Sequence, residues 1–376
     1  MKLFSLKAQR YRSLRDVDIA LEDLNVFIGT NASGKSSILD ALRFLQEGIQ
    51  YRDFKEPVSN RGGIVHLAWK GEDAQQIDLA AQIKGDDHVY EWSVRVSRRD
   101  GYDFSIQEEV SELPPGSPPI TLLSADNGTG WWWSGEKQRV KLKQNATACA
   151  LAAASADETF PARQIAEFVG GWGFFDPSPF SLRRSWAGLE MSRLDAYGRN
   201  LAERLYDLRQ SSSGIFYQIV SATQSVLGLP TALEPRESEG RYYFAQEEPG
   251  LRHLVHQIGT SSGTLRMLAL MTALFEGAGS SLVGIEEPEN HVHPTALGAF
   301  AEYLLKARDR VQILVTTHSP ILLDFLKDPG VICIVRRADQ NGTHVARETN
   351  IDGIRQALEA SGFGLGEFYE TKGFGG

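Results

Sequence analysis

The sequence predicts an α/β fold, in which a mixed, largely parallel sheet with flanking helices is interrupted by a long insertion. The glycine-rich residues 29–36 follow an apolar run and precede an amphipathic one, as in a strand–turn–helix unit. Near-continuous apolar runs at 280–285 and 311–316 are typical of parallel strands buried on both faces. These two regions lie near opposite ends of the chain, so we predict one core that residues 50–250 divide.

The first 50 residues predict three strands and one helix. Strand-like patterns lie around residues 3–8, 17–21 and 24–28. The helix is expected to begin at Lys35, directly after the glycine loop, and to continue to about Gly48.

Residues 51–145 are predicted to form an antiparallel β insertion, because short period-2 stretches alternate with Gly, Asp and Pro. The proline-rich residues 111–119 are expected to form a loop, and Asn127-Gly128 is a turn signal before three consecutive tryptophans. The expected strands are residues 64–69, 76–83, 89–96, 102–108 and 120–123.

Residues 146–250 are predicted to be a mainly helical insertion, with helices at 162–169, 199–208 and 215–226. Alternating helix and strand then return, with a third buried strand at 331–335. The predicted domains are a core of residues 1–50 and 251–350, the two insertions, and a C-terminal helix with a mobile tail at 351–376. No heptad pattern persists over several repeats, so we expect no long coiled coil.

Composition excludes several classes of protein. The 376 residues are 42% hydrophobic, which suits one large domain or two modest ones, and the net charge of −9 excludes a global basic field for nucleic acid. Cys149 and Cys333 lie among apolar or small residues, as buried thiols do. We find no signal-peptide core and no apolar run of membrane length, so we expect a cytoplasmic protein with no membrane segment.

Residues 29–36 read Gly-Thr-Asn-Ala-Ser-Gly-Lys-Ser and match the phosphate-binding loop G-x-x-x-x-G-K-[ST] at every specified position. Glycines allow the backbone to form a ring of N–H donors, and the following helix adds its positive end. Lys35 would reach the β- and γ-phosphates, and the Ser36 hydroxyl would bind Mg²⁺. An ordinary glycine turn is the alternative. The motif predicts binding of a nucleoside triphosphate.

Two strand ends carry candidate catalytic residues. Glu286 and Glu287 follow one buried strand, at the sheet edge where ligands of parallel α/β folds bind. The first carboxylate would hold Mg²⁺, and the second would orient or deprotonate the attacking water. His318 follows the next strand, where it would donate a hydrogen bond to the terminal phosphate. A solvated acidic turn and a structural histidine are the alternatives.

A Ser/Gly-rich segment at residues 259–264 precedes an apolar helix. Any helix can begin with serine, so the pattern is weak by itself. The free N–H groups of a helix N-terminus nevertheless form an anion site.

Taken in order, these motifs resemble the ABC-type ATPases of the SMC/RecF/OLD branch, and most closely the compact bacterial "AAA family" predicted ATPases. The resemblance covers residues 1–48 and 255–336, whereas the middle of the chain matches only loosely. In the family's pattern, Arg12 matches a nucleotide-facing arginine, and Ser261 and Gly263 match the signature motif. Glu286 and Glu287 match the end of the Walker B motif. Residues 290–293 occupy the D-loop position, and His318 matches the switch histidine.

The resemblance implies an ABC-type ATPase head with ATP and Mg²⁺ as cofactors, and a homodimer that closes around two ATP molecules. It implies three catalytic residues, Lys35, Glu287 and His318, and two metal ligands, Ser36 and Glu286. The implied nucleotide-binding residues are Arg12, Gly29, Thr30, Asn31, Ala32, Ser33, Gly34, Lys35, Ser36, Ser37, Ser261 and Gly263.

Three positions depart from the family pattern. Glu286 stands where the first Walker B acid is commonly Asp, and Ser262 replaces the first signature glycine. Glutamine is missing from an obvious Q-loop, whose place residues 174–179 occupy. Whether this chain has the Mg²⁺-linked coupling that a Q-loop glutamine provides is therefore an open question.

The leading interpretation is an ATP-hydrolysing switch or clamp in DNA repair, genome maintenance or anti-phage defence. An ATPase subunit of a membrane transporter and an ATP-sensing interaction module with little turnover are the alternatives. No nuclease domain is visible, because too few residues follow His318 for a Toprim domain. We therefore expect a protein effector partner, encoded nearby.

The partner contact is expected within residues 50–250, because the ends of the chain are occupied by the ATP site. Residues 131–133 are three tryptophans that would anchor a partner or stack on bases, or form a partly buried corner. Small basic clusters near residues 98, 139 and 183 are either solvated surface or contacts to DNA.

Overall fold

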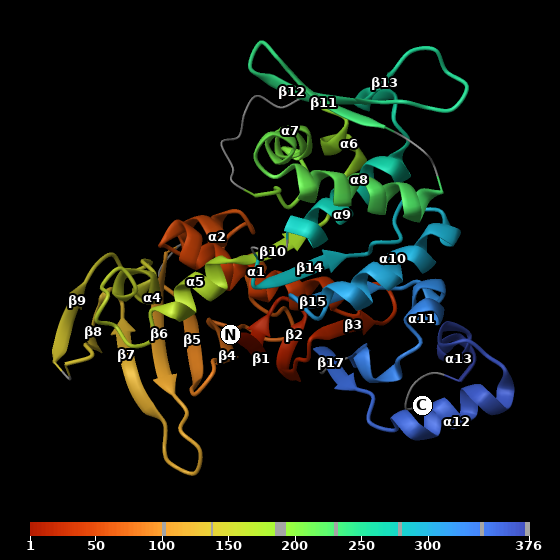
Figure 1. The fold of residues 1–376 in the computed structure, drawn as a ribbon. Helices are drawn as coiled ribbons and strands as arrows, with labels where there is room; N and C mark the ends of the chain where they lie inside the picture. The colour runs from red at the N-terminus through yellow and green to blue at the C-terminus, as the bar shows by residue number, and fades with distance from the viewer. Residues whose placement is uncertain are drawn as a thin grey trace. The chain divides into compact units, whose positions relative to one another are not determined.

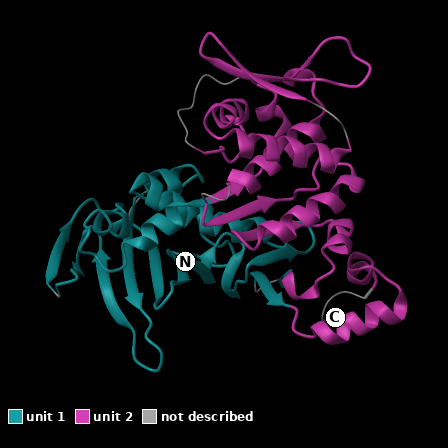
Figure 2. Ribbon diagram, viewed as in Figure 1, with its two compact units in different colours: residues 1–172, 333–347 teal, residues 173–332, 348–376 magenta. Residues whose placement is uncertain are grey.

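The computed structural model contains two compact units (Figures 1 and 2). Unit 1 is Met1–Trp172 with Cys333–Arg347, and unit 2 is Gly173–Ile332 with Glu348–Gly376. Tyr102 of a predicted strand, Lys137 of a predicted basic cluster and the predicted tail at 373–376 lie outside the described residues. The structure describes residues 1–99, 103–136, 138–184, 193–228, 232–276, 280–338 and 342–372.

Unit 1 contains an eight-stranded sheet in the order β2-β1-β4-β5-β6-β7-β8-β9, and each neighbouring pair is antiparallel. The predicted meander is confirmed from residue 76 onward, and the Asn127-Gly128 turn joins β7 to β8. The strands are β1 (Lys2–Tyr11), β2 (Leu14–Ala20), β4 (Gln76–Lys84), β5 (Val89–Arg98), β6 (Phe104–Glu112), β7 (Ile120–Asp126), β8 (Thr129–Trp133) and β9 (Arg139–Lys143).

The predicted strand at residues 64–69 is wrong, because Ile64–Leu67 forms the short helix α3. Gly62 and Gly63 precede it with φ of 80° and 89°, and so reverse the chain through a region that favours glycine. Ile64 and Leu67 are buried while the two residues between them are exposed, which is the spacing of one helical turn.

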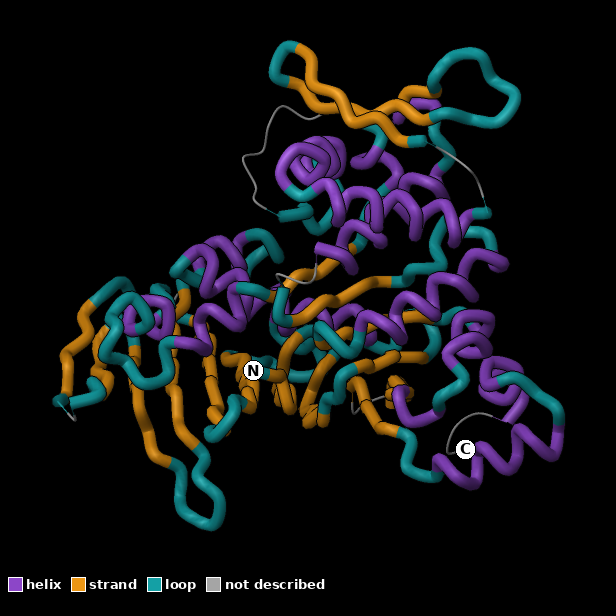
Figure 3. The backbone as a smooth tube through the Cα atoms, viewed as in Figure 1, coloured by secondary structure: helices purple, strands orange, loops and turns teal. Residues whose placement is uncertain are grey.

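Burial alternates along the central strands of the sheet, so one face is covered and the other is open to solvent. On the covered side α4 contacts β6 and β7, and α1 contacts β1 and α5 (Figure 3). Glu108 of β6 lies in this core and accepts hydrogen bonds from Trp92 and from the N–H groups of Ala150 and Leu151. Burial raises the pKa of the Glu108 carboxyl. The helices of unit 1 are α1 (Lys35–Tyr51), α2 (Lys55–Ser59), α3, α4 (Ala150–Ala154) and α5 (Gln164–Gly170).

A second group of neighbouring strands in unit 1 supports the glycine loop: β3 (Leu24–Ile28), β16 (Ile332–Ala338) and β17 (Gly342–Arg347). Every residue of β3 is buried, as its apolar run predicts. β16 and β17 are antiparallel, and β17 also contacts β2. The chain therefore returns to its N-terminal region more than 300 residues later.

In unit 2, β10 (Trp172–Phe175), β14 (Leu282–Glu286) and β15 (Gln312–Thr317) are neighbours. β14 and β15 are parallel, and Glu286 is paired with Thr316 at their carboxyl ends. Almost every side chain of these two strands is buried. The predicted pair of buried parallel strands is confirmed.

The rest of unit 2 is helical apart from a three-stranded sheet in the order β11-β12-β13, which contacts α7 (Figure 3). Its strands, β11 (Leu233–Ser238), β12 (Arg241–Gln246) and β13 (Val255–His256), were not predicted, because β11 buries a single residue, Pro235, and so lacks alternation. No described helix is long and apolar enough to cross a membrane. The helices are α6 (Pro179–Leu182), α7 (Leu201–Ser211), α8 (Ser213–Leu227), α9 (Ser262–Glu276), α10 (Pro294–Ala307), α11 (Pro320–Leu326), α12 (Ile351–Ser361) and α13 (Leu365–Lys372), with 3-10 turns at Gln257–Gly259 and Pro329–Val331.

Candidate nucleotide-binding and hydrolysis site

The glycine loop joins β3 to α1 in unit 1. Its backbone passes twice through the left-handed region, at Ala32 (φ 62°) and Gly34 (φ 113°), which is the geometry of a concave nest of N–H groups. Lys35 is only 5% exposed, and its Nζ donates to the carbonyl oxygens of Gly29 (2.8 Å) and Thr30 (3.1 Å). The lysine is therefore held inside the loop, where a phosphate chain would meet it.

Thr343 of β17 closes the loop from the far end of the sequence. Its Oγ1 donates to the Ser33 carbonyl (2.8 Å) and lies 2.9 Å from Ser13 Oγ, which lies 3.0 Å from Ser37 Oγ. A Cβ on Gly34 would lie 2.1 Å from the same Thr343 oxygen. The second glycine of the motif is thus required by close approach as well as by its positive φ.

Arg12 lies at the end of β1 and is fixed by the first turns of α1. Its Nε is 2.8 Å from Asp40 Oδ2, and the same carboxylate accepts hydrogen bonds from Tyr11 (2.5 Å) and Arg61 (3.0 Å). Burial, and then the nearby Asp40 charge, raise the pKa of the Tyr11 hydroxyl. Arg12 remains 39% exposed, so its guanidinium is oriented yet accessible.

The two predicted metal ligands are chemically suited to Mg²⁺, which prefers oxygen donors. Ser36 is exposed in the first turn of α1, in unit 1. Glu286 is the last residue of β14 and is half-buried, in unit 2. The P-loop thus ends in a hydroxyl and β14 ends in a carboxylate, and both groups are of the kind that binds Mg²⁺.

The candidate catalytic turn follows β14 in unit 2. Glu287 has a φ of 42°, which is strained for a glutamate, and its N–H donates to the Thr316 carbonyl (2.9 Å). Asn290 donates to Glu287 Oε2 (2.9 Å), and Glu287 Oε1 lies 3.6 Å from Nδ1 of His318. Glu289 accepts from the backbone N–H of His318 (2.9 Å). The predicted acid and histidine are therefore held side by side at the carboxyl ends of two parallel strands.

Arg266 of α9 is 2% exposed and bonds to the backbone of this turn. Its Nη2 donates to the carbonyl oxygens of Glu286 (2.8 Å) and Glu287 (3.0 Å) and lies 3.2 Å from Asp176. Its Nη1 donates to the Pro177 carbonyl. One guanidinium therefore joins α9, the candidate catalytic turn and residues 176–177, which follow β10 in the segment predicted to take the place of the Q-loop.

The signature residues lie at the start of α9. Ser261 is exposed, and its Oγ accepts from the Thr264 N–H (3.1 Å), as a helix N-cap does. A Cβ on Gly263 would lie 2.8 Å from the His291 carbonyl of the D-loop position. The glycine is needed because these two motifs approach so closely within one unit.

The departure at Ser262 has a structural reason. Its Oγ accepts a hydrogen bond from Nη2 of Arg183 (2.9 Å), and the same nitrogen donates to the Thr260 carbonyl (3.2 Å). The serine that replaces a signature glycine therefore ties the start of α9 to the end of α6.

Comparisons with known proteins agree with these motifs. Residues 1–114 match the family described as "AAA ATPase domain", and residues 182–324 match "AAA domain, putative AbiEii toxin, Type IV TA system". A 100-residue segment is 34% identical to DNA replication and repair protein RecF of Actinobacillus pleuropneumoniae serotype 5b (strain L20), and covers 26% of this chain and 24% of that protein. A 121-residue segment is 31% identical to the DNA double-strand break repair Rad50 ATPase of Sulfolobus acidocaldarius, and covers 32% of this chain and 13% of that protein. The matched segments span a quarter or less of these relatives.

The fold resembles SMC heads along nearly the whole chain. The SMC head bound to the C-winged helix domain of ScpA aligns with a TM-score of 0.56 at 14% identity, over 94% of this chain and 100% of that one. A second SMC head, bound to the C-terminal domain of ScpA and derived from Pyrococcus furiosus, gives 0.52 at 11% identity, over 96% and 100%. Together these matches support an ABC-type ATPase of the SMC/RecF branch. The predicted family and fold class are confirmed.

Unit 1 contains the P-loop and Arg12, which pairs with Asp40 of the helix after the loop, and unit 2 holds Glu287 beside His318 and Gly263 beside His291. Sequence reasoning missed three supporting residues: Asp40, Arg266 and Thr343. Arg266 did leave a signal, because it is the single charged residue in the apolar run from 265 to 274. The other two follow from contacts between distant segments and leave no local pattern.

Proposed function

We propose that this protein hydrolyses ATP and alternates between a monomer and a homodimer closed around two ATP molecules. The observation that carries hydrolysis is the catalytic turn. There, one oxygen of Glu287 is fixed by Asn290 and the other faces His318. A carboxylate held in this way is suited to take the proton of an attacking water.

In the proposed reaction each half of the site has its own task. The P-loop and Lys35 bind the phosphate chain of ATP through N–H donors and a positive charge. Mg²⁺, bound by Ser36 and Glu286, would neutralise part of the phosphate charge. Glu287 accepts the proton of the water, and His318 donates a hydrogen bond to the terminal phosphate oxygen as negative charge develops there.

Dimerisation is proposed because the signature carries anion-binding groups that its own unit leaves exposed. Ser261 and the N-terminus of α9 present a hydroxyl and a positive helix end. In the family, the signature of one subunit caps the nucleotide of the other. The solved SMC heads support this proposal through their similar fold. Both are bound to a domain of ScpA, and by analogy we expect this chain to bind a protein partner.

We place the ATP cycle in DNA repair, genome maintenance or defence against phage. RecF and Rad50 relatives support repair, and the family described for residues 182–324 names a toxin of a toxin–antitoxin system, which supports defence. In either process we propose that the ATP-bound dimer acts through a protein effector, with DNA as a further ligand.

The test is a complementation of two inactive variants. Ser261→Arg fills the signature, and Lys35→Ala disables the P-loop, so each homodimer has two defective sites. A mixed dimer has one site with both parts intact, so an equal mixture should recover up to about a quarter of the wild-type ATPase rate. No recovery, together with a wild-type rate per molecule that does not change with concentration, would contradict dimerisation. ATP binding without turnover in the wild type would instead support the ATP-sensing alternative.

A further inference from the structure

Five side chains gather at the free edge of the eight-stranded sheet. Trp131 and Trp133 of β8 are half-buried, and Arg139, Lys141 and Lys143 of β9 are exposed. We call these five residues the tip patch. β9 is the last strand in the order of the sheet, so the patch lies at a strand that has one neighbour only.

The strand register places the tip patch on a single face. Trp131 is directly opposite Lys141, and Trp133 is directly opposite Arg139, so each indole has a cation as its cross-strand neighbour. Trp132, between the two indoles, points to the other face, where it is 4% exposed and contacts Phe160. The Trp triplet is thus one core residue flanked by two surface residues.

The contacts of the tip patch are with its own members. The Arg139 guanidinium lies 4.2 Å from the centre of the Trp131 ring, and the two indoles meet edge to face at 5.7 Å. Within the described part of the chain, no carboxylate forms an ion pair with Arg139, Lys141 or Lys143. The patch therefore presents three uncompensated positive charges beside two aromatic rings.

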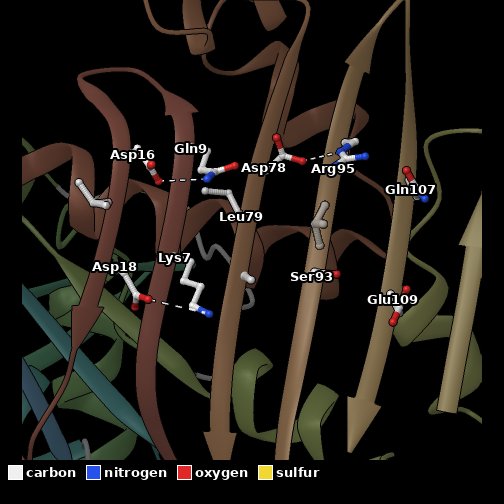
Figure 4. Close-up of a pocket in the computed structure, with 13 residues that line it drawn as sticks. Lys7, Gln9, Asp16, Asp18, Asp78, Leu79, Ser93, Arg95, Gln107 and Glu109 are labelled. Atoms are coloured by element: carbon white, nitrogen blue, oxygen red, sulfur yellow. Dashed lines mark hydrogen bonds and ion pairs between the residues drawn. The ribbon is translucent and has the colours of Figure 1, made fainter. Parts of the chain in front are cut away.

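A hollow on the same open face has paired cations instead. A row of cross-strand neighbours runs from Ser93 and Glu109, which line a hollow of about 460 Å³, to Trp131 at the tip. In that hollow the lining cations are paired: Lys7 lies 3.9 Å from Asp18, and Arg95 donates to the Asp78 carboxylate (Figure 4). The tip patch thus differs from this hollow, where the lining cations have carboxylate partners.

Protection of a sheet edge explains only part of this arrangement. Charged residues, lysine above all, keep exposed edge strands from pairing with other chains. That role does not require tryptophans, which usually lie in cores or at binding sites because their exposure to water is unfavourable. Edge protection therefore explains the cations of the tip patch but does not explain why two half-buried indoles lie beside them.

We propose that the tip patch binds single-stranded nucleic acid. A single strand alternates aromatic bases with negative phosphates, and the patch repeats an indole with a cation at alternate residues, about 6.8 Å apart along an antiparallel strand. Bases would stack on Trp131 and Trp133, while phosphates pair with Arg139, Lys141 and Lys143. A duplex is a poorer ligand, because its bases are stacked on one another. The inference goes beyond the ATP cycle and does not depend on it.

The test is fluorescence anisotropy of labelled oligothymidine and of a matched duplex, titrated with the full chain and with its variants. Trp131→Leu should weaken single-strand binding by about 5- to 100-fold, whereas Trp131→Phe, which keeps a ring, should retain most of it. Trp69→Leu is the matched control, because Trp69 is also half-buried beneath an arginine, Arg15, at 5.1 Å, but lies outside the patch.

The cations are tested through salt. Lys141→Gln with Lys143→Gln should reduce the slope of log affinity against log salt by about 1.4, since each lost phosphate contact on a single strand contributes about 0.7. Unchanged ATP affinity and circular dichroism would show that the variants are folded. The proposal is overturned if the wild type binds no single strand at low salt, if it prefers the duplex, or if Trp131→Leu and Trp131→Phe bind equally well.

Discussion

The P-loop and the catalytic turn perform matched tasks but are held in place in different ways. The P-loop holds its lysine with its own backbone, since Lys35 donates to carbonyls only five and six residues away. The catalytic turn is held from a distance, because the Arg266 guanidinium reaches the Glu287 carbonyl from 21 residues away. The hydrogen bonds that hold Lys35 are local, so they depend only on the P-loop segment itself. The catalytic turn depends on the packing of α9.

This difference has a consequence for the ATP cycle. Arg266 lies on α9, whose first residues carry the signature, and it bonds the two carbonyls that shape the catalytic turn. Anything that shifts the start of α9 therefore acts on Glu287, whose strained φ leaves it dependent on outside support. We infer that the guanidinium couples the start of α9 to the position of Glu287.

The largest expected effect is at the catalytic turn itself. Glu287→Gln keeps the side-chain shape and the hydrogen bond to Asn290 but removes the proton acceptor. Hydrolysis should fall by about 100- to 10,000-fold while ATP binds as before. Rates from phosphate release and ATP affinity from calorimetry provide the measurement, and size-exclusion chromatography with ATP and Mg²⁺ should show an accumulated dimer. Hydrolysis at the wild-type rate would assign the role to another residue.

The P-loop comes next. Lys35→Ala removes the charge that the loop holds at the phosphate position, so ATP affinity should fall by at least about 30-fold, the loss typical of a truncated, desolvated charge partner. Calorimetric titration with a non-hydrolysable ATP analogue measures it, and the melting temperature serves as a control for folding. Unchanged affinity would contradict the assignment of the loop.

Arg266 tests whether the catalytic turn needs support from α9. Arg266→Gln should lower kcat by about 10- to 100-fold, because a catalytic group displaced by about 1 Å loses rate on this scale. ATP affinity should stay near that of the wild type, since the P-loop holds itself. Arg266→Lys, which restores the charge but not the fork of donors, should recover part of kcat.

Two results would separate this role from general stabilisation. A loss of ATP affinity and of kcat in the same proportion, with a lowered melting temperature, would mean that Arg266 only stabilises unit 2. A fall in kcat with intact affinity and with partial rescue by lysine would confirm its effect on Glu287.

The sequence predicted those parts of the molecule that depend on near neighbours. Residues 29–36, the strand before them and the acidic pair at the end of β14 are continuous patterns, and the structure has a loop, a buried strand and a strand-to-turn junction there. Period-2 alternation located the meander but failed at residues 64–69, where two glycines reverse the chain first. The contacts of Arg266, Asp40 and Thr343 join residues that are 20 to 310 positions apart in the chain. A single sequence does not show which distant residues come into contact, so these contacts could not be predicted.

The smallest expected effect is at Thr343, which supports the P-loop from β17. Thr343→Val removes the hydroxyl that donates to the Ser33 carbonyl while preserving the shape of the side chain. One neutral hydrogen bond contributes about 0.5–1.5 kcal/mol, so ATP affinity should fall by only about 2- to 10-fold. Thr343→Ser, which keeps the hydroxyl, is the matched control and should bind as the wild type does. Because the loop is fixed mainly by its own backbone and by Lys35, loss of one distant support should leave it competent. A loss as large as that of Lys35→Ala would mean that the P-loop depends on distant contacts as much as the catalytic turn does, and the contrast between the two regions would fail.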